Sequence, residues 1–173
     1  ILMQGEHVSL FVYVRGYAAR DVLYQLWKMI EDAGDWDVIM YMHECVEDTP
    51  TLKHGDLIDW MEMFFNEKRV WVLIADNATG DICGIGWYKN FQHNSATCHI
   101  WMAPQYRGKP HSREAVKLGI EFGHKELNLP ILQAFTPFAV ARNLARKAGF
   151  KDVCFIPHLF GYDVWLLEHK KEL

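Results

Sequence analysis

The chain has little of what would place it in a membrane, in an oxidising compartment or around a structural metal. Its 173 residues include four cysteines, none in a Cys-x-x-Cys pair, so we expect free thiols in a reducing compartment and no structural metal site. No apolar run approaches the ~18 residues of a membrane span, and no charged start precedes an apolar signal region. These absences predict a soluble, cytoplasmic protein without a membrane partner. The chain opens Ile1-Leu2-Met3, and Met3 is a candidate native start.

A strong net charge is also absent, since the formal charge at pH 7 is −4. Residues 1–67 hold 13 of the 22 acids and four of the 18 basic residues, for a net −9, while residues 68–173 carry +5. An acidic half favours a cationic or amine-bearing partner. The alternative is that both charged regions are ordinary solvated faces. The negative overall charge, and basic residues without interleaved aromatics, argue against nucleic acid as a partner.

Half of the residues are hydrophobic and 14% are aromatic, which predicts one compact domain over residues 1–173 that needs no disulfide or metal. Hydrophobic periodicity predicts an α+β fold around a mostly antiparallel sheet. Helices are expected around residues 22–30 and 57–65, over residues 112–127, and before a glycine cap at Gly149. Strands are expected over residues 8–14, 70–75, 82–88, 96–102, 131–135, 153–156 and 162–167.

Residues 100–115 are the most informative segment, because a strand passes through a turn directly into the start of a helix. The first turn of a helix carries N–H groups without an internal partner and a partial positive charge, so an anion binds there readily. Gly108 permits close approach of the backbone, and Arg107 and Lys109 add cations on either side. The pattern predicts a loop for a diphosphate, and an ordinary solvated loop is the alternative.

Three motifs resemble the GNAT acyltransferase superfamily, most closely its ribosomal-protein and amino-acid N-acetyltransferase branch. They are Pro-Gln-Tyr-Arg-Gly-Lys at 104–109, Glu-Ala at 114–115 and Ala-Arg-Asn-Leu-Ala-Arg-Lys-Ala-Gly-Phe at 141–150. Their order and spacing agree with the family over residues 70–167. The resemblance implies a GNAT-like fold with acetyl-CoA as cosubstrate, residues 68–173 forming the CoA-binding half and residues 1–67 the acceptor-side half.

The resemblance also implies where CoA binds. The backbone of Ile100 and Met102 grips the pantetheine arm, and the loop and helix start hold the pyrophosphate. The second glycine of the family loop is Pro110 here, which removes one N–H donor at a cost on the order of 1.5–3 kcal/mol. The Ser112 hydroxyl is a candidate to restore part of that loss. The implied loop residues are Arg107, Gly108, Lys109, Pro110, His111 and Ser112.

Acyl transfer to an amine needs a base, donors for the oxyanion and a proton for the leaving thiolate. Where the related branch often carries a carboxylate on the strand, this chain has Thr97. His99 lies on the same side two residues on, and is the candidate base, with a partly buried structural histidine as the alternative. His43 and Glu44 are weaker candidates. Tyr162 is either the acid or a residue packed at the sheet edge.

Two further family positions lack their usual polar side chains. Ala145 stands where many members carry a tyrosine acid, and Phe138 stands where they carry an asparagine. We therefore keep two hypotheses. The first is an acetyl-CoA-dependent N-acyltransferase acting on an amine of a small molecule or protein. The second is a catalytically inactive GNAT-fold binding or assembly protein, with a protein partner, of the kind encoded by bacteriophages. A homodimer is compatible with both.

Overall fold

The computed structural model describes residues 2–13, 20–36, 38–39, 69–159 and 161–172. Within them, eight strands form one sheet in the order β1-β2-β3-β4-β5-β6-β8-β7. Every neighbouring pair is antiparallel except β5 and β6, which are parallel. The predicted α+β class, with a mixed and mostly antiparallel sheet flanked by helices, is confirmed.

The strands agree with the sequence pattern to within a few residues, except at the beginning of the chain and in the last hairpin. A first strand of three residues was not predicted, because it is too short to show a hydrophobic period. The last two strands are longer than their apolar runs. The strands are β1 (Leu2–Gln4), β2 (Val8–Val12), β3 (Val70–Asp76), β4 (Ile82–Lys89), β5 (Ser95–Met102), β6 (Ile131–Thr136), β7 (Lys151–Leu159) and β8 (Tyr162–Lys170).

The described helices are α1 (Arg20–Ala33), the short 3-10 helix η1 (Pro104–Tyr106), α4 (Pro110–Lys125) and α5 (Ala139–Lys147). α4 begins two residues before its predicted start, because proline suits the first helical position. Gly149 follows α5 with a φ of 103°, as expected of a glycine cap. The helix predicted over residues 57–65 lies outside the described residues. Among the described helices, none has the length and apolar character to cross a membrane.

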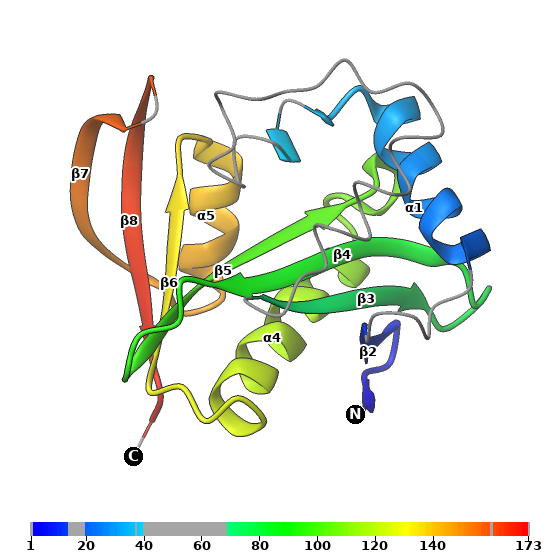
Figure 1. The fold of residues 1–173 in the computed structure, drawn as a ribbon, viewed down its shortest axis with the longest axis horizontal. Helices are drawn as coiled ribbons and strands as arrows, with labels where there is room; N and C mark the ends of the chain where they lie inside the picture. Colours follow the sequence, from blue (N-terminus) through cyan, green and yellow to red (C-terminus); the bar gives the residue numbers. More distant parts are fainter. Residues whose placement is uncertain (1, 14–19, 37, 40–68, 160, 173) are drawn as a thin grey trace.

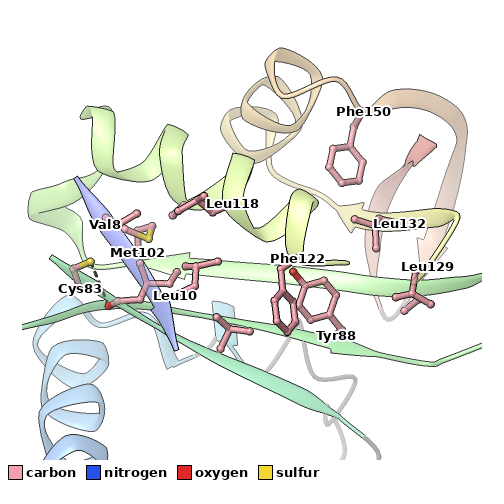
Figure 2. Close-up of a cluster of buried hydrophobic side chains, with 14 of the residues drawn as sticks. Val8, Leu10, Cys83, Tyr88, Met102, Leu118, Phe122, Leu129, Leu132 and Phe150 are labelled. Atoms are coloured by element: carbon pink, nitrogen blue, oxygen red, sulfur yellow. Dashed lines mark hydrogen bonds between the residues drawn. The ribbon is translucent and has the colours of Figure 1, made fainter. Parts of the chain in front are cut away.

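The two faces of the sheet are covered by different helices (Figure 1). Side chains alternate along each strand. Val72 of β3 therefore joins the core beneath α4, and its neighbour Trp71 joins the core beneath α1. Figure 2 shows Leu118 and Phe122 pointing from α4 toward the strands. The strands thus form a rigid layer that holds α4 on one face and α1 on the other.

β5 and β6 touch at one end and then separate. Their parallel pairing covers only residues 95–97 of β5 and 131–133 of β6, whereas β5 pairs with β4 as far as Met102. Figure 1 shows the two strands diverging from the shared end, like the arms of a V. The last residues of β5 therefore have a strand partner on one edge only within the described sheet.

Glu114 on α4 holds the turn between β1 and β2. Its Oε1 accepts a hydrogen bond from the backbone N–H of Glu6 at 2.8 Å, and its Oε2 accepts from His7 at 2.6 Å and Val8 at 2.8 Å. A Cβ on Gly5 would overlap the carboxyl group, so a larger residue there would displace Glu114 from its hydrogen bonds. Burial alone would raise the pKa of Glu114, but the three N–H donors outweigh burial and lower it below its ordinary value of 4.5.

We expect Glu114→Gln to lower the free energy of unfolding by about 2 kcal/mol at pH 7, because three N–H donors lose a charged acceptor. A carboxylate whose pKa is lowered by folding stabilises the protein above its unfolded pKa, and this contribution is lost as the pH falls through the folded pKa. Urea midpoints of wild type and variant should therefore converge below about pH 4. Glu121→Gln is the control, since Glu121 pairs only with exposed Lys125 on the same helix. An equal loss in both variants would contradict the assignment.

Candidate active site

The free edge of β5 carries the backbone groups of Ile100 and Met102. The N–H of Ala103 donates to the Cys83 carbonyl at 2.9 Å. Backbone groups alternate between the two edges of a strand, so His99 also faces β4, whereas Ile100 and Met102 face the diverging β6. The two backbones that the resemblance assigned to pantetheine therefore lie on the edge that β6 leaves open. The Met102 carbonyl accepts a hydrogen bond from a side chain, which leaves its N–H as the free group.

The loop after β5 ends in a cradle of backbone N–H groups at the start of α4. Gly108 has a φ of 70° with open space around its Cβ position, so the backbone conformation, and not crowding, requires glycine. Pro110 at the first helical position has no N–H to offer. The second and third helical residues carry N–H groups without an intrahelical partner. The available donors are the N–H groups of Gly108, His111 and Ser112.

The Arg107 side chain contacts groups within the fold. Its Nε donates to the Met102 carbonyl at 2.9 Å, and its Nη2 pairs with Asp35, the residue after the turn that ends α1. Its guanidinium lies 5.8 Å from the centre of the Trp101 ring. Its cation thus pairs with a carboxylate of the fold, and its expected place beside an anion stays a prediction. The side chain of Lys109, at the helix cap, is exposed and makes no capping hydrogen bond.

The side chains of His111 and Ser112 also have partners within the fold. His111 Nε2 lies 3.6 Å from the carboxylate of Asp76 at the end of β3, and the Tyr106 hydroxyl donates to the same carboxylate at 3.3 Å. The Ser112 hydroxyl donates to the Tyr106 carbonyl at 2.6 Å, so its proton is not available to a ligand. Both residues thus contribute backbone N–H groups, and their side chains brace the loop.

Asp76 is a well-stabilised carboxylate in this brace. A hydrogen bond from the Ala78 N–H, 2.9 Å from Oδ1, is the largest influence and lowers the pKa of Asp76. Burial opposes that shift, while Tyr106 and His111 add to it. Asp76 therefore stays ionised at neutral pH and fixes the loop against the β3–β4 hairpin.

His99 lies on the face of the sheet that α1 covers. Its ring stacks on Trp87 with centroids 5.1 Å apart, and Trp87 stacks on Trp71 at the same separation. Its Nε2 is buried and has no hydrogen-bond partner among the described residues. Burial first, and then the positive charges of Lys89 and Arg69, lower the pKa of His99 well below its usual 6.5. The imidazole is therefore neutral at pH 7.

Tyr162 is the first residue of β8, directly after the turn at Gly161, and its side chain is 45% exposed. The pairing of β6 with β8 ends at Thr136 and Trp165. Tyr162 thus lies beyond the carboxyl end of β6, on the side where β5 and β6 are apart. His43 and Glu44 lie outside the described residues.

Cys98 is the one thiol on β5, close to the point where β6 leaves. Its Sγ donates to the Gln133 carbonyl at 3.4 Å, and burial raises its pKa to about 12. The protonated thiol is a poor nucleophile at neutral pH, so the site offers no cysteine for an acyl-enzyme step at this position. Within the part of the chain that the structure describes, no three His, Cys, Asp or Glu side chains gather as a metal site.

α5 carries no polar group at the two positions where the family usually has one. Ala145 packs against the core beneath α4 and α5. Phe138 stands at the N-cap position without a side-chain capping hydrogen bond, and its N–H donates to the Thr136 hydroxyl at 3.1 Å. Arg142 on the same helix donates two hydrogen bonds to Asp152, at 3.0 and 2.8 Å. This basic side chain is therefore held by the neighbouring strand.

The sequence analysis missed Asp35 and Asp76, the two carboxylates that tie down the loop. Asp35 is 72 positions from its partner Arg107, and Asp76 is 30 positions from Tyr106. Neither residue belongs to a motif, and only Asp76 stands near a recognisable turn. No pattern in the sequence pairs such distant residues.

A family model described as an acetyltransferase (GNAT) domain matches residues 15–151, which begins well before the motifs in the sequence. No curated protein matches the chain. Among solved structures, a GNAT-family acetyltransferase from Bacillus anthracis is 16% identical, with a TM-score of 0.73 and 98% of each chain covered.

Two further structures share this fold. Spermidine N-acetyltransferase from Vibrio cholerae, in complex with CoA and spermine, is 17% identical, covers 96% of each chain and has a TM-score of 0.71. The ribosomal-protein-S5-alanine acetyltransferase from Vibrio fischeri is 15% identical over 98% of this chain and 96% of its own, with a TM-score of 0.67. At these identities the likeness establishes the fold alone. Since the family model spans most of the residues and the fold agrees, the chain belongs to the GNAT acetyltransferase family.

Proposed function

We propose that this protein is an N-acetyltransferase that moves the acetyl group of acetyl-CoA to the amine of a small molecule or protein. The observation that carries the proposal is the free edge of β5 running directly into a helix start with unpaired N–H groups. The first feature suits the amides of a pantetheine arm, and the second suits a pyrophosphate. Family membership supports the same chemistry.

In this proposal, backbone groups of two segments make the main contacts with the cosubstrate. Ile100 and Met102 would hydrogen-bond the pantetheine arm, and the N–H groups of Gly108, His111 and Ser112 would hold the pyrophosphate. The exposed Lys109 adds a cation beside that cradle. The cosubstrate supplies the acetyl group as a thioester, so no metal is required for the transfer.

In the transfer, the acceptor nitrogen forms a bond to the thioester carbonyl carbon and the carbon–sulfur bond breaks. His99, or a base acting through water, takes the proton of the amine, and a backbone N–H stabilises the charge on the carbonyl oxygen. The proton needed by the leaving thiolate comes from Tyr162 or from water. The amine attacks the thioester directly, and the Cys98 thiol, which stays protonated at neutral pH, does not act as a nucleophile.

The first experiment is a calorimetric titration of the protein with acetyl-CoA, with free CoA and ADP as controls for the thioester and nucleotide contacts. We expect micromolar binding of acetyl-CoA. No binding at millimolar ligand would contradict the proposal and favour the inactive binding protein. An acceptor screen follows, in which thiol release is measured with spermidine and with a short peptide that has a free N-terminal amine. Thiol release that depends on an amine is the expected result.

We expect Pro110→Gly to bind acetyl-CoA about tenfold more tightly, because the variant restores an N–H donor to a charged ligand. The gain should appear with ADP as well, since the added donor faces the pyrophosphate. Pro104→Gly is the control, because it loosens the same loop at exposed η1 without adding a donor to the cradle. Unchanged or weaker binding in Pro110→Gly would show that the proline ring serves the loop better than another donor.

A further inference from the structure

Asp35 links the acceptor side of the molecule to the cofactor loop. Its Oδ2 accepts a hydrogen bond from Trp101 Nε1 at 2.9 Å and also pairs with Arg107 Nη2. The Asp35 side chain is 17% exposed and that of Arg107 is 47% exposed, so the pair is partly shielded from water. We call this pair the Asp35–Arg107 clasp.

The clasp is anchored at both ends. The Asp35 N–H donates to the Ile30 carbonyl of α1 at 3.2 Å, and the Asp35 carbonyl accepts from Ile39 at 3.0 Å. Ile30 is buried in the core between α1 and the sheet. The carboxylate is therefore fixed to the end of α1, which Figure 1 shows beside the carboxyl end of β5.

At the other end, the contacts of Arg107 define the loop conformation. Its Nε holds the Met102 carbonyl, and its backbone N–H donates to the Pro104 carbonyl at 3.2 Å. Arg107 thus connects the last residue of β5, through its side chain, with the turn that leads to Gly108, through its backbone. A loop held in its binding conformation loses less conformational entropy when a ligand arrives, so it binds more tightly.

We propose that Asp35 is a positioning residue for acetyl-CoA, acting through Arg107 to hold the phosphate loop and to couple that loop to α1. The inference rests on the proposed function, since it assigns a role in binding the same cosubstrate. Coupling of this kind is reciprocal. Cofactor on the loop therefore steadies the end of α1, and an ordered α1 favours cofactor binding.

The test compares acetyl-CoA affinity of the wild type, Asp35→Asn and Asp32→Asn by calorimetry. Asn keeps an oxygen for Trp101 and removes the charge that holds Arg107. Asp32→Asn is the matched control. It removes the same charge one turn earlier in the chain, where Asp32 forms an exposed ion pair with Lys28. We expect about a tenfold weaker Kd for Asp35→Asn and less than a twofold change for Asp32→Asn. Equal affinity in all three proteins would overturn the inference.

A double-mutant cycle with Arg107→Gln separates positioning from general damage. If the clasp acts as one unit, the second substitution adds little to the first, whereas additive losses would overturn the inference. Arg107→Lys is the further variant, which keeps the charge but not the fork that reaches both partners. Its affinity should fall toward that of Asp35→Asn, and wild-type affinity for Arg107→Lys would contradict the clasp.

Hydrogen exchange measures a ligand-dependent protection that a change in overall stability alone would not alter. Adding acetyl-CoA to the wild type should slow exchange in residues 30–36, and this protection should be absent in Asp35→Asn at saturating ligand. Protection in both proteins would argue against coupling. The proposed function is contradicted by a different result. If the wild type does not bind acetyl-CoA, the proposed function is wrong whatever the variants do.

Discussion

Replacing His99 with alanine or glutamine is expected to lower kcat by about 100-fold or more, while the Kd for acetyl-CoA stays within twofold. A positioned base contributes roughly 10²–10⁴ to rate, and the buried Nε2 of His99 has no other partner among the described residues. Glutamine fills most of the space beside Trp87, so it keeps the fold if alanine disturbs the ring stack. His93→Ala, in the exposed turn before β5, is the control. Retained turnover in both His99 variants would remove His99 as the base.

The pH profile tests the same assignment. Burial and the positive charges of Lys89 and Arg69 lower the pKa of His99 well below 6.5. A base is active when unprotonated, so kcat/KM expressed per unprotonated amine should stay constant from pH 7 to pH 6.5 and decline only at lower pH as His99 takes up a proton. This acidic decline should be missing from the residual activity of His99→Gln. A decline centred at or above pH 6.5 would indicate another base.

Replacing Gly84 with alanine is expected to cost about 3 kcal/mol of stability and to weaken acetyl-CoA binding. An ideal Cβ there would lie 2.5 Å from the Trp101 carbonyl oxygen and 2.6 Å from Met102 Sδ. The first contact is with backbone, so β5 must move away from β4 at the register pair of Gly84 and Met102. That shift displaces the free edge that we propose for the pantetheine arm. Urea unfolding and calorimetry measure the two effects.

Gly86→Ala is the matched control for this prediction. Gly86 lies two residues further along β4 on the same side, and its nearest obstacle is the His99 carbonyl oxygen at 3.3 Å. A neighbour at that distance yields by a few tenths of an ångström, so we expect a loss of about 1 kcal/mol or less. Equal losses in the two variants would show that the approach of β4 to β5 is not the source of the effect.

Most of the fold beyond residue 69 was predictable from local pattern. The hairpin of β3 and β4, with a turn ending at Gly80 (φ 78°), follows from two apolar runs around turn residues. α4 follows from hydrophobic spacing, although it begins two residues before its predicted start, and the end of α5 follows from the glycine just past it. The order of strands and the separation of β5 from β6 did not follow, because strand pairing depends on contacts between residues far apart in the chain.

The candidate site likewise has features that the sequence predicts and features that it does not. The backbone donors of Ile100, Met102 and Gly108 were accessible from sequence, because a strand edge, a glycine turn and a helix start have fixed geometry. The orientation of side chains was not accessible. The sequence predicts Arg107 as a phosphate ligand, and in the structure its guanidinium pairs with Asp35.

The sequence by itself determined the family and most of the helices and strands after residue 69, because each depends on residues near one another in the chain. Only the tertiary structure decided where the charged side chains go. Arg107 pairs with Asp35, His111 with Asp76 and Glu114 with the β1–β2 turn. These partners are brought together by the packing of helices on two faces of one sheet. Their charges are satisfied by neighbours that no local pattern specifies.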